Sequence, residues 1–139
     1  MQYKRFGNTY MIRFDVGEEI LQALRQICMQ EGIRLGRINA IGAADHAVIG
    51  VYDIQQQKYH REELDGFMEI TDLSGSVTEM DGQPYIHLHV TLADQKNTLH
   101  GGHAIDVRVG ATCEMFVQML DGTVTREKDE TLGINLWKL

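Results

Sequence analysis

Apolar side chains recur at every second position in two stretches, residues 10–14 and 84–92, which is the pattern of half-buried strands. The stretch from Tyr10 to Phe14 shows this period clearly, and the turn dipeptide Gly7-Asn8 precedes it. A turn between two alternating segments is typical of a β-hairpin. We therefore expect residues 1–16 to form a hairpin.

One segment follows a helical period instead. Between Glu18 and Glu31 apolar residues return every three or four positions, which predicts an amphipathic helix. Asp15 stands three residues before Glu18, as in a capping box, and Gly32 is a natural helix stop. The apolar stripe consists of Ile20, Leu24, Ile27 and Cys28. On that stripe Cys28 is expected to be a small core residue and not a nucleophile.

Beyond Gly32 the pattern predicts strands joined by tight turns. The expected strands are 34–44, 46–54, 67–80, 84–92, 105–109, 112–120 and 132–139, with a bend or bulge at 74–76. Asp81-Gly82 and Asp121-Gly122 are hairpin turns, whereas 93–103 and the charge run 126–130 are predicted as loops. One early helix with many antiparallel strands predicts an α+β domain. The many strand edges favour association between copies of the chain.

Composition narrows the function classes. The chain has 139 residues, of which 43% are apolar and 24% charged, so we expect one globular domain over 1–139. A net charge of −7 disfavours avid binding to DNA phosphates. The two cysteines form no CxxC pair, which fits a reducing cytoplasm. We find no secretory signal and no apolar run long enough for a membrane span.

Three histidines carry the clearest chemistry. His87 and His89 are two residues apart in an expected strand, so their rings project side by side. The flexible Gly101-Gly102 step can bring His103 against them. Three imidazoles without a fourth protein ligand suit zinc, or another divalent transition metal, with an open position for a small ligand. The alternative interpretation is a solvated polar strand face.

Other candidates are weaker. His100 flanks the glycine pair and points less clearly to the site, and His46 and His60 are expected at the surface. The first metal motif of cupin barrels is approximated by residues 82–101, but the second motif is absent because Pro84 is the sole proline. Candidate general bases are Glu69, Asp72, Asp94, Asp106 and Glu114. A small anion-binding patch can be drawn from Arg5, Arg13, Arg34 and Arg37.

Several stretches, taken in order, resemble the plant-and-prokaryote-conserved (PPC) domain family. They are Tyr10–Ile20, Gly32–Ala43, Ile70–Val77, Pro84–His89 and Gly101–His103, and together they span about residues 4–137. The resemblance implies a trimer-forming α+β domain, and it implies that His87, His89 and His103 are metal ligands, with zinc the expected metal. The family is commonly labelled DNA-binding, largely through plant members with an AT-hook, which this chain lacks.

Three hypotheses follow for the function. The first is a homotrimeric metal-binding module whose open site holds a small anionic ligand. The second is a metal-dependent enzyme that acts on a small anionic substrate at the same site, with an acidic residue as base. The third is a DNA-binding or transcription-associated protein, as the family label implies.

Overall fold

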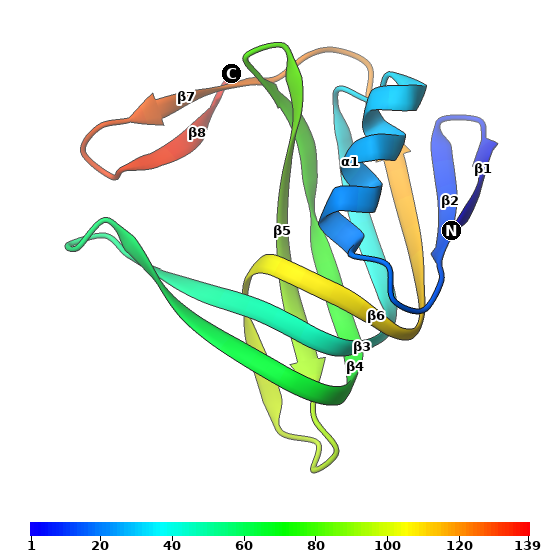
Figure 1. Cartoon of the computed structure of the whole chain (residues 1–139). Coiled ribbons are helices and arrows are strands. Elements are labelled where there is room, and N and C mark those ends of the chain that lie inside the picture. The colour runs from blue at the N-terminus through cyan, green and yellow to red at the C-terminus, as the bar shows by residue number, and fades with distance from the viewer.

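The computed structural model describes all residues 1–139 and shows the α+β fold expected from the sequence (Figure 1). Eight strands form one sheet system, and the single helix α1 spans Ile20–Glu31. The strands are β1 (Gln2–Phe6), β2 (Thr9–Phe14), β3 (Gly36–Asp53), β4 (Lys58–Met80), β5 (Gln83–Ala93), β6 (Leu99–Met119), β7 (Thr125–Asp129) and β8 (Ile134–Lys138).

The sheet is antiparallel except for one bridge between β4 and β7. The strand order is β1-β2-β6-β3-β4-β7-β8, and β5 pairs with both β4 and β6. The pairings β3–β4, β4–β5, β5–β6 and β6–β3 therefore close a ring of four strands. This closure removes the edges that β5 would otherwise expose.

The helix forms where the periodicity predicted it, but it begins two residues later. The carboxylate of Glu19 caps the first turn by accepting hydrogen bonds from the backbone N–H groups of Leu21 (2.9 Å) and Gln22 (2.6 Å). Glu18 instead accepts from the backbone N–H of Asp15, at 2.7 Å. Gly32 ends the helix in the left-handed conformation, as expected.

The core lies between α1 and the inner face of the sheet. The helical stripe is fully buried there against alternate residues of β2, β3, β5 and β6. Cys28 and Cys113 belong to this core, and burial raises the pKa of each thiol to about 12. Both side chains are therefore packing residues, as predicted for Cys28.

Several strand boundaries differ from the expectation because β-bulges bridge the interruptions in the pattern. The predicted strands 34–44 and 46–54 join into β3, with register shifts near Ala44 and His46. The strands 105–109 and 112–120 likewise join into β6. The prediction of a loop over 93–103 is wrong at its second half, since β6 begins at Leu99. The charge run 126–130 was wrongly predicted as a loop, because most of it forms β7.

The expected bulge at 74–76 is also absent. Ser74, Gly75 and Ser76 pair in regular register with β5. The glycine is there for a different reason: a Cβ at position 75 would lie 1.9 Å from the carbonyl oxygen of His87. β4 and β5 approach so closely at this point that no side chain fits.

Three of the four arginines considered for an anion patch hold separate partners, and the fourth, Arg37, lines a hollow beside Trp137. Arg5 donates to the carbonyl of Gly7, and Arg13 pairs with Asp15. Arg34 pairs with Glu79, on a different part of the sheet. We find no shared anion site in these contacts.

The structure has no helix with the length and hydropathy of a membrane span.

Candidate metal centre

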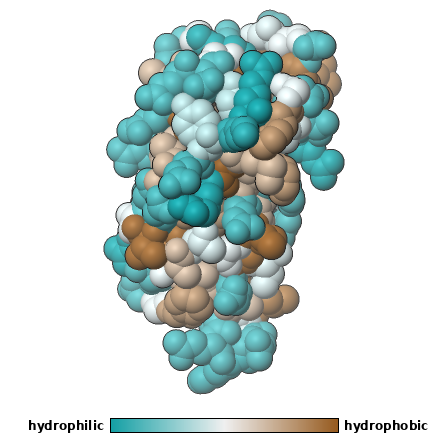
Figure 2. All heavy atoms as spheres, turned by 90° about the vertical axis from the view of Figure 1, so that its right-hand side faces the viewer, coloured by the Kyte–Doolittle hydropathy of each residue, from teal (hydrophilic) through white to brown (hydrophobic).

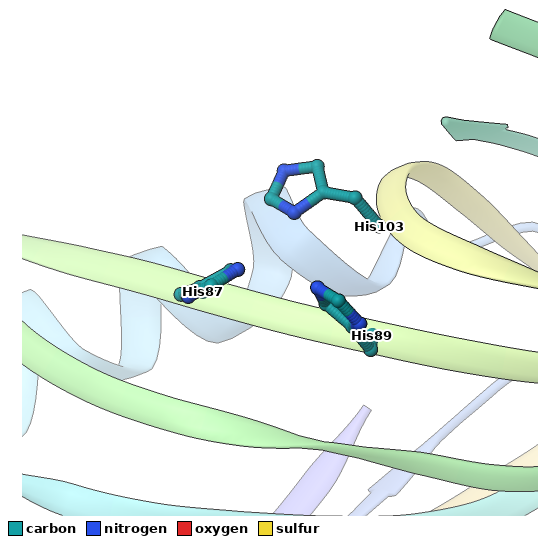
Figure 3. A group of neighbouring side chains, drawn as sticks. All are labelled: His87, His89 and His103. Carbon is teal, nitrogen blue, oxygen red and sulfur yellow. The ribbon is translucent and has the colours of Figure 1, made fainter. Parts of the chain in front are cut away.

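The three predicted histidines come together on the outer face of the sheet, opposite α1. His87 and His89 lie on β5, and His103 lies directly across from His89 on the neighbouring strand β6. The three ring centroids are 5.1–5.7 Å apart, and one nitrogen from each ring lies within 4.8 Å of the others. Figure 3 shows that each ring turns a nitrogen toward the same central space.

Glycines make this convergence possible. A Cβ at Gly102 would lie 2.8 Å from the carbonyl oxygen of Gly50, so β6 can pass close to β3 only with glycine there. Gly75 permits an even closer approach of β4 to β5 at His87. The Gly-Gly step was correctly expected to allow close approach, but it works inside a strand and not in a turn.

The environment favours the neutral form of His87 and His103. Burial lowers the pKa of His87 to about 4, and the nearby His103, Arg126 and His89 reinforce the effect. Burial and His89 also lower the pKa of His103. Neutral imidazole is the form that binds metals, because the ligand nitrogen must be free of its proton.

One buried nitrogen in this cluster lacks a partner. His103 Nδ1 is inaccessible to solvent and makes no hydrogen bond. In Figure 3 this nitrogen, next to the ring carbon that joins the side chain, faces His87 and His89. Leaving a buried polar atom unpaired costs free energy, so such atoms call for an explanation. A divalent ion held by the three nitrogens would satisfy it, and the donor set therefore fits a metal.

Most of the chain matches a known protein family. The Plants and Prokaryotes Conserved (PCC) domain matches residues 1–121. This chain belongs to the PCC domain family. The family is the one that the ordered motifs predicted, and the match includes all three histidines.

Solved structures show the same PCC fold. A candidate DNA-binding protein from Bacteroides thetaiotaomicron has a TM-score of 0.96 and 28% identity, covering 99% of this chain and 96% of that one. A metal-containing protein from Archaeoglobus fulgidus has a TM-score of 0.90 and 34% identity, with coverages of 100% and 99%. A plant- and prokaryote-conserved protein from Pyrococcus horikoshii has a TM-score of 0.90 and 32% identity, with coverages of 99% and 94%.

A curated relative is much longer. The bifunctional protein GlmU of Synechococcus sp. (strain JA-2-3B'a(2-13)) is 32% identical over 95 residues. The match covers 68% of this PCC chain but only 14% of that protein. The chain thus spans a small part of the length of the curated relative that it matches.

The other histidines of the PCC chain lie apart from the triad. His46 contacts Asp65 at 2.8 Å, His60 contacts Asp53 at 3.3 Å, and His100 lies 3.5 Å from Asp94. The cluster of His46, Glu63 and Asp65 also has metal-ligand spacing. Its two carboxylates are exposed, and it has no unpaired buried atom such as the triad has.

None of the five candidate bases belongs to the triad's ligand group. Asp94 is occupied by its own loop, where it accepts hydrogen bonds from the N–H groups of Lys96 and Thr98. Asp72 lies beside the site, because it accepts a hydrogen bond from Ser74, the cross-strand partner of His89. Among the five candidate bases, Asp72 is therefore the one that Ser74 connects to the triad.

Sequence reasoning missed three aromatic and basic neighbours of the site. Tyr59 stacks on His103, with ring centroids 4.9 Å apart. Trp137 lines a hollow together with His87 and His89, and Arg126 lies near His87. They come from distant segments, and no local pattern marks them as neighbours of the histidines.

The metal-free PCC protein is expected to lose stability as the pH falls from about 6.5 to 4. In this window an unfolded His87 takes up a proton, whereas the folded side chain resists it until about pH 4. Above pH 6.5 His87 is neutral in both the folded and the unfolded chain, so its titration lowers the free energy of unfolding only below that pH. The full shift corresponds to about 3 kcal/mol, and partial exposure reduces the expected loss to roughly 1–2 kcal/mol. Urea unfolding across this range should show it, and a His87→Gln variant should flatten the dependence. An equally steep dependence in the variant would contradict the assignment.

Proposed function

We propose that this PCC chain is a metal-binding protein whose His87, His89 and His103 hold a divalent transition metal, with zinc the best match. The observation that carries the proposal is the convergence of three imidazole nitrogens, one of them buried without a hydrogen-bond partner. Imidazole suits zinc best among the abundant metals. The similarity to a metal-containing protein from Archaeoglobus fulgidus supports it.

Three protein ligands leave room for a fourth, so we propose that the site binds a small anionic ligand. A bound divalent ion would supply positive charge and Lewis-acid polarisation to that ligand. The protein's part is to hold three neutral imidazoles in place and to shape the hollow beside them. The same geometry would serve a metal-dependent enzyme, for which Asp72, linked through Ser74, is the best-placed acid.

The direct test is elemental analysis of tag-free protein, both as purified and after exposure to zinc. We expect about one zinc per chain. Protein that contains no transition metal and takes up none when it is offered would overturn the proposal.

We further propose that the chain assembles as a homotrimer, as its family resemblance implies. The chain exposes 8011 Å², compared with roughly 7,300 Å² for a compact monomer of its mass. Exposed apolar side chains include the directly paired Met11 and Phe116, together with Ile41 and Phe67. Figure 2 views the molecule from the right-hand side of Figure 1, where β1 and β2 lie, and shows apolar patches among the polar side chains. Light scattering is expected to give three times the mass of the chain, and a monomeric mass would contradict this.

DNA binding is the second candidate function. It is favoured by structural neighbours described as candidate DNA-binding proteins, from Bacteroides thetaiotaomicron and Ralstonia eutropha. The net charge of −7 opposes it, because DNA affinity arises mainly from Lys and Arg contacts to phosphates. A duplex-DNA mobility shift at physiological salt and micromolar protein separates the two functions. We also propose a cytoplasmic location, which the two free thiols support.

A further inference from the structure

The β7–β8 hairpin lies against the three-histidine site, although it follows the part of the chain that matches the family. Tyr85 precedes His87 on the same face of β5. The guanidinium of Arg126, on β7, lies 4.5 Å from the centre of the Tyr85 ring and 5.9 Å from that of Trp137, on β8. The hairpin therefore places the Arg126 guanidinium over Tyr85, two residues before His87, with the indole of Trp137 next to it.

Arg126 is held firmly but lacks a counter-ion. Its Nε donates to the hydroxyl of Thr78 at 2.8 Å, and its Nη1 donates to the carbonyl of Asn135 at 2.7 Å. No carboxylate lies within 4.0 Å, whereas Arg34 and Arg108 each have one. Nη2 makes no hydrogen bond within the chain. A partly buried cation without an anionic partner is electrostatically costly, and an anion from solution would remove that cost.

Trp137 lines two hollows. The first has a volume of about 390 Å³ and is lined by His87, His89 and the serines on either side of Gly75. The second, of about 310 Å³, is apolar; besides Trp137 its lining includes Leu35, Leu120, Val124 and Leu139. Gly75, Ser76 and Trp137 line both. A ligand with a polar end at the histidines can thus lay an apolar end against the indole.

The hairpin is tied in place from its far end as well. The hydroxyl of Tyr52 donates to the carbonyl of Leu132, at 2.9 Å. Gln57 donates to the carbonyls of Glu130 and Thr131, at 3.4 and 3.1 Å. The tip of the β3–β4 hairpin therefore holds the β7–β8 turn, and Arg126 and Trp137 are positioned before a ligand arrives.

We propose that Arg126 and Trp137 form the recognition wall of the three-histidine site and select a small monocarboxylate with a compact apolar group. Arg126 binds the carboxylate through its free Nη2, and the indole of Trp137 packs on the apolar group. Arg126 offers one unoccupied donor group, Nη2, which matches one carboxylate. The proposal rests on the proposed function, because the ligand lies beside the metal-binding histidines.

The test is a ligand-observed NMR titration of zinc-loaded protein with benzoate, acetate and the neutral isostere benzamide. We expect benzoate to bind more tightly than either of the other two. Arg126→Gln should weaken benzoate binding by about tenfold to a hundredfold, the range for a lost charge-assisted hydrogen bond, with zinc content unchanged. Arg34→Gln is the matched control and should bind benzoate like the wild type.

Arg126 also donates hydrogen bonds to Thr78 and Asn135, so its replacement could disturb the fold as well as ligand binding. A second variant, at Trp137, separates these two effects. The half-exposed Trp137 tolerates replacement better, and Trp137→Ala should weaken benzoate while acetate binding stays unchanged. Equal benzoate affinity in the wild type and both variants at full zinc occupancy would overturn this inference alone, as would the absence of benzoate binding. If the protein takes up no zinc, the proposed function fails. Arg126-dependent benzoate binding to the metal-free protein would then still support the recognition wall, and its absence would overturn that too.

Discussion

Replacing His87 and His89 together with alanine is expected to abolish metal binding and the stability that metal confers. Each of these imidazoles supplies one of three converging nitrogens, so the double variant retains a single protein ligand. Saturating metal at about a thousand times its dissociation constant stabilises a folded protein by about 4 kcal/mol. We expect that gain in the wild type and none in the variant, measured by thermal unfolding with and without zinc and by elemental analysis.

The matched control removes two histidines elsewhere. His46 and His60 pair with Asp65 and Asp53 outside the triad, so the His46→Ala/His60→Ala variant should bind zinc like the wild type. Loss of metal in this control with retention in the first variant would move the site to His46 and its neighbouring carboxylates. Retention in both variants would contradict the three-histidine centre.

Gly75→Ala is expected to be the most damaging single-atom change near the site. The added Cβ would lie 1.9 Å from the carbonyl oxygen of His87 and 2.9 Å from its carbonyl carbon. Both are backbone atoms of a paired strand, so β4 and β5 must separate locally. We expect a loss of about 3 kcal/mol or more, the upper end for overpacking, in urea unfolding. Zinc affinity should fall as well, because the displaced backbone carries His87.

Gly101→Ala provides the comparison for this prediction. At that position the nearest atom to an added Cβ is the carbonyl oxygen of Val90, 3.3 Å away, so a shift of a few tenths of an ångström suffices. We expect a loss below about 1 kcal/mol. Similar stabilities for the two variants would show that β4 and β5 are not as tightly apposed as described.

Local periodicity predicted the elements well where a single face is buried. The helical stripe, the alternation of residues 10–14 and the two-residue spacing of His87 and His89 all depend on neighbours in sequence. The pattern was less informative where strands bend. Bulges near Ala44 and His46 reset the alternation inside β3, and a broken pattern was therefore interpreted as two strands.

The charge run was misjudged for a related reason. Residues 126–130 are all charged, with both signs mixed, which is equally compatible with a solvated loop and with a strand at the sheet margin. Arg126 becomes partly buried only because Tyr85 and Trp137 flank it. Tyr85 lies 41 positions before Arg126 in the sequence and Trp137 lies 11 positions after it, so a short window around Arg126 contains neither ring.

The sequence by itself determined the α+β class, the helix, the family and the pair of histidines on one strand face. These features follow from short-range periodicity, helix-stop and turn residues, and ordered motifs. The tertiary structure decided what depends on pairing between distant segments: His103 opposite His89, Tyr59 stacked on His103, and the hairpin that carries Arg126 and Trp137. Strand register and close approach at glycines are set by contacts across the whole sheet, and no local window of sequence contains them.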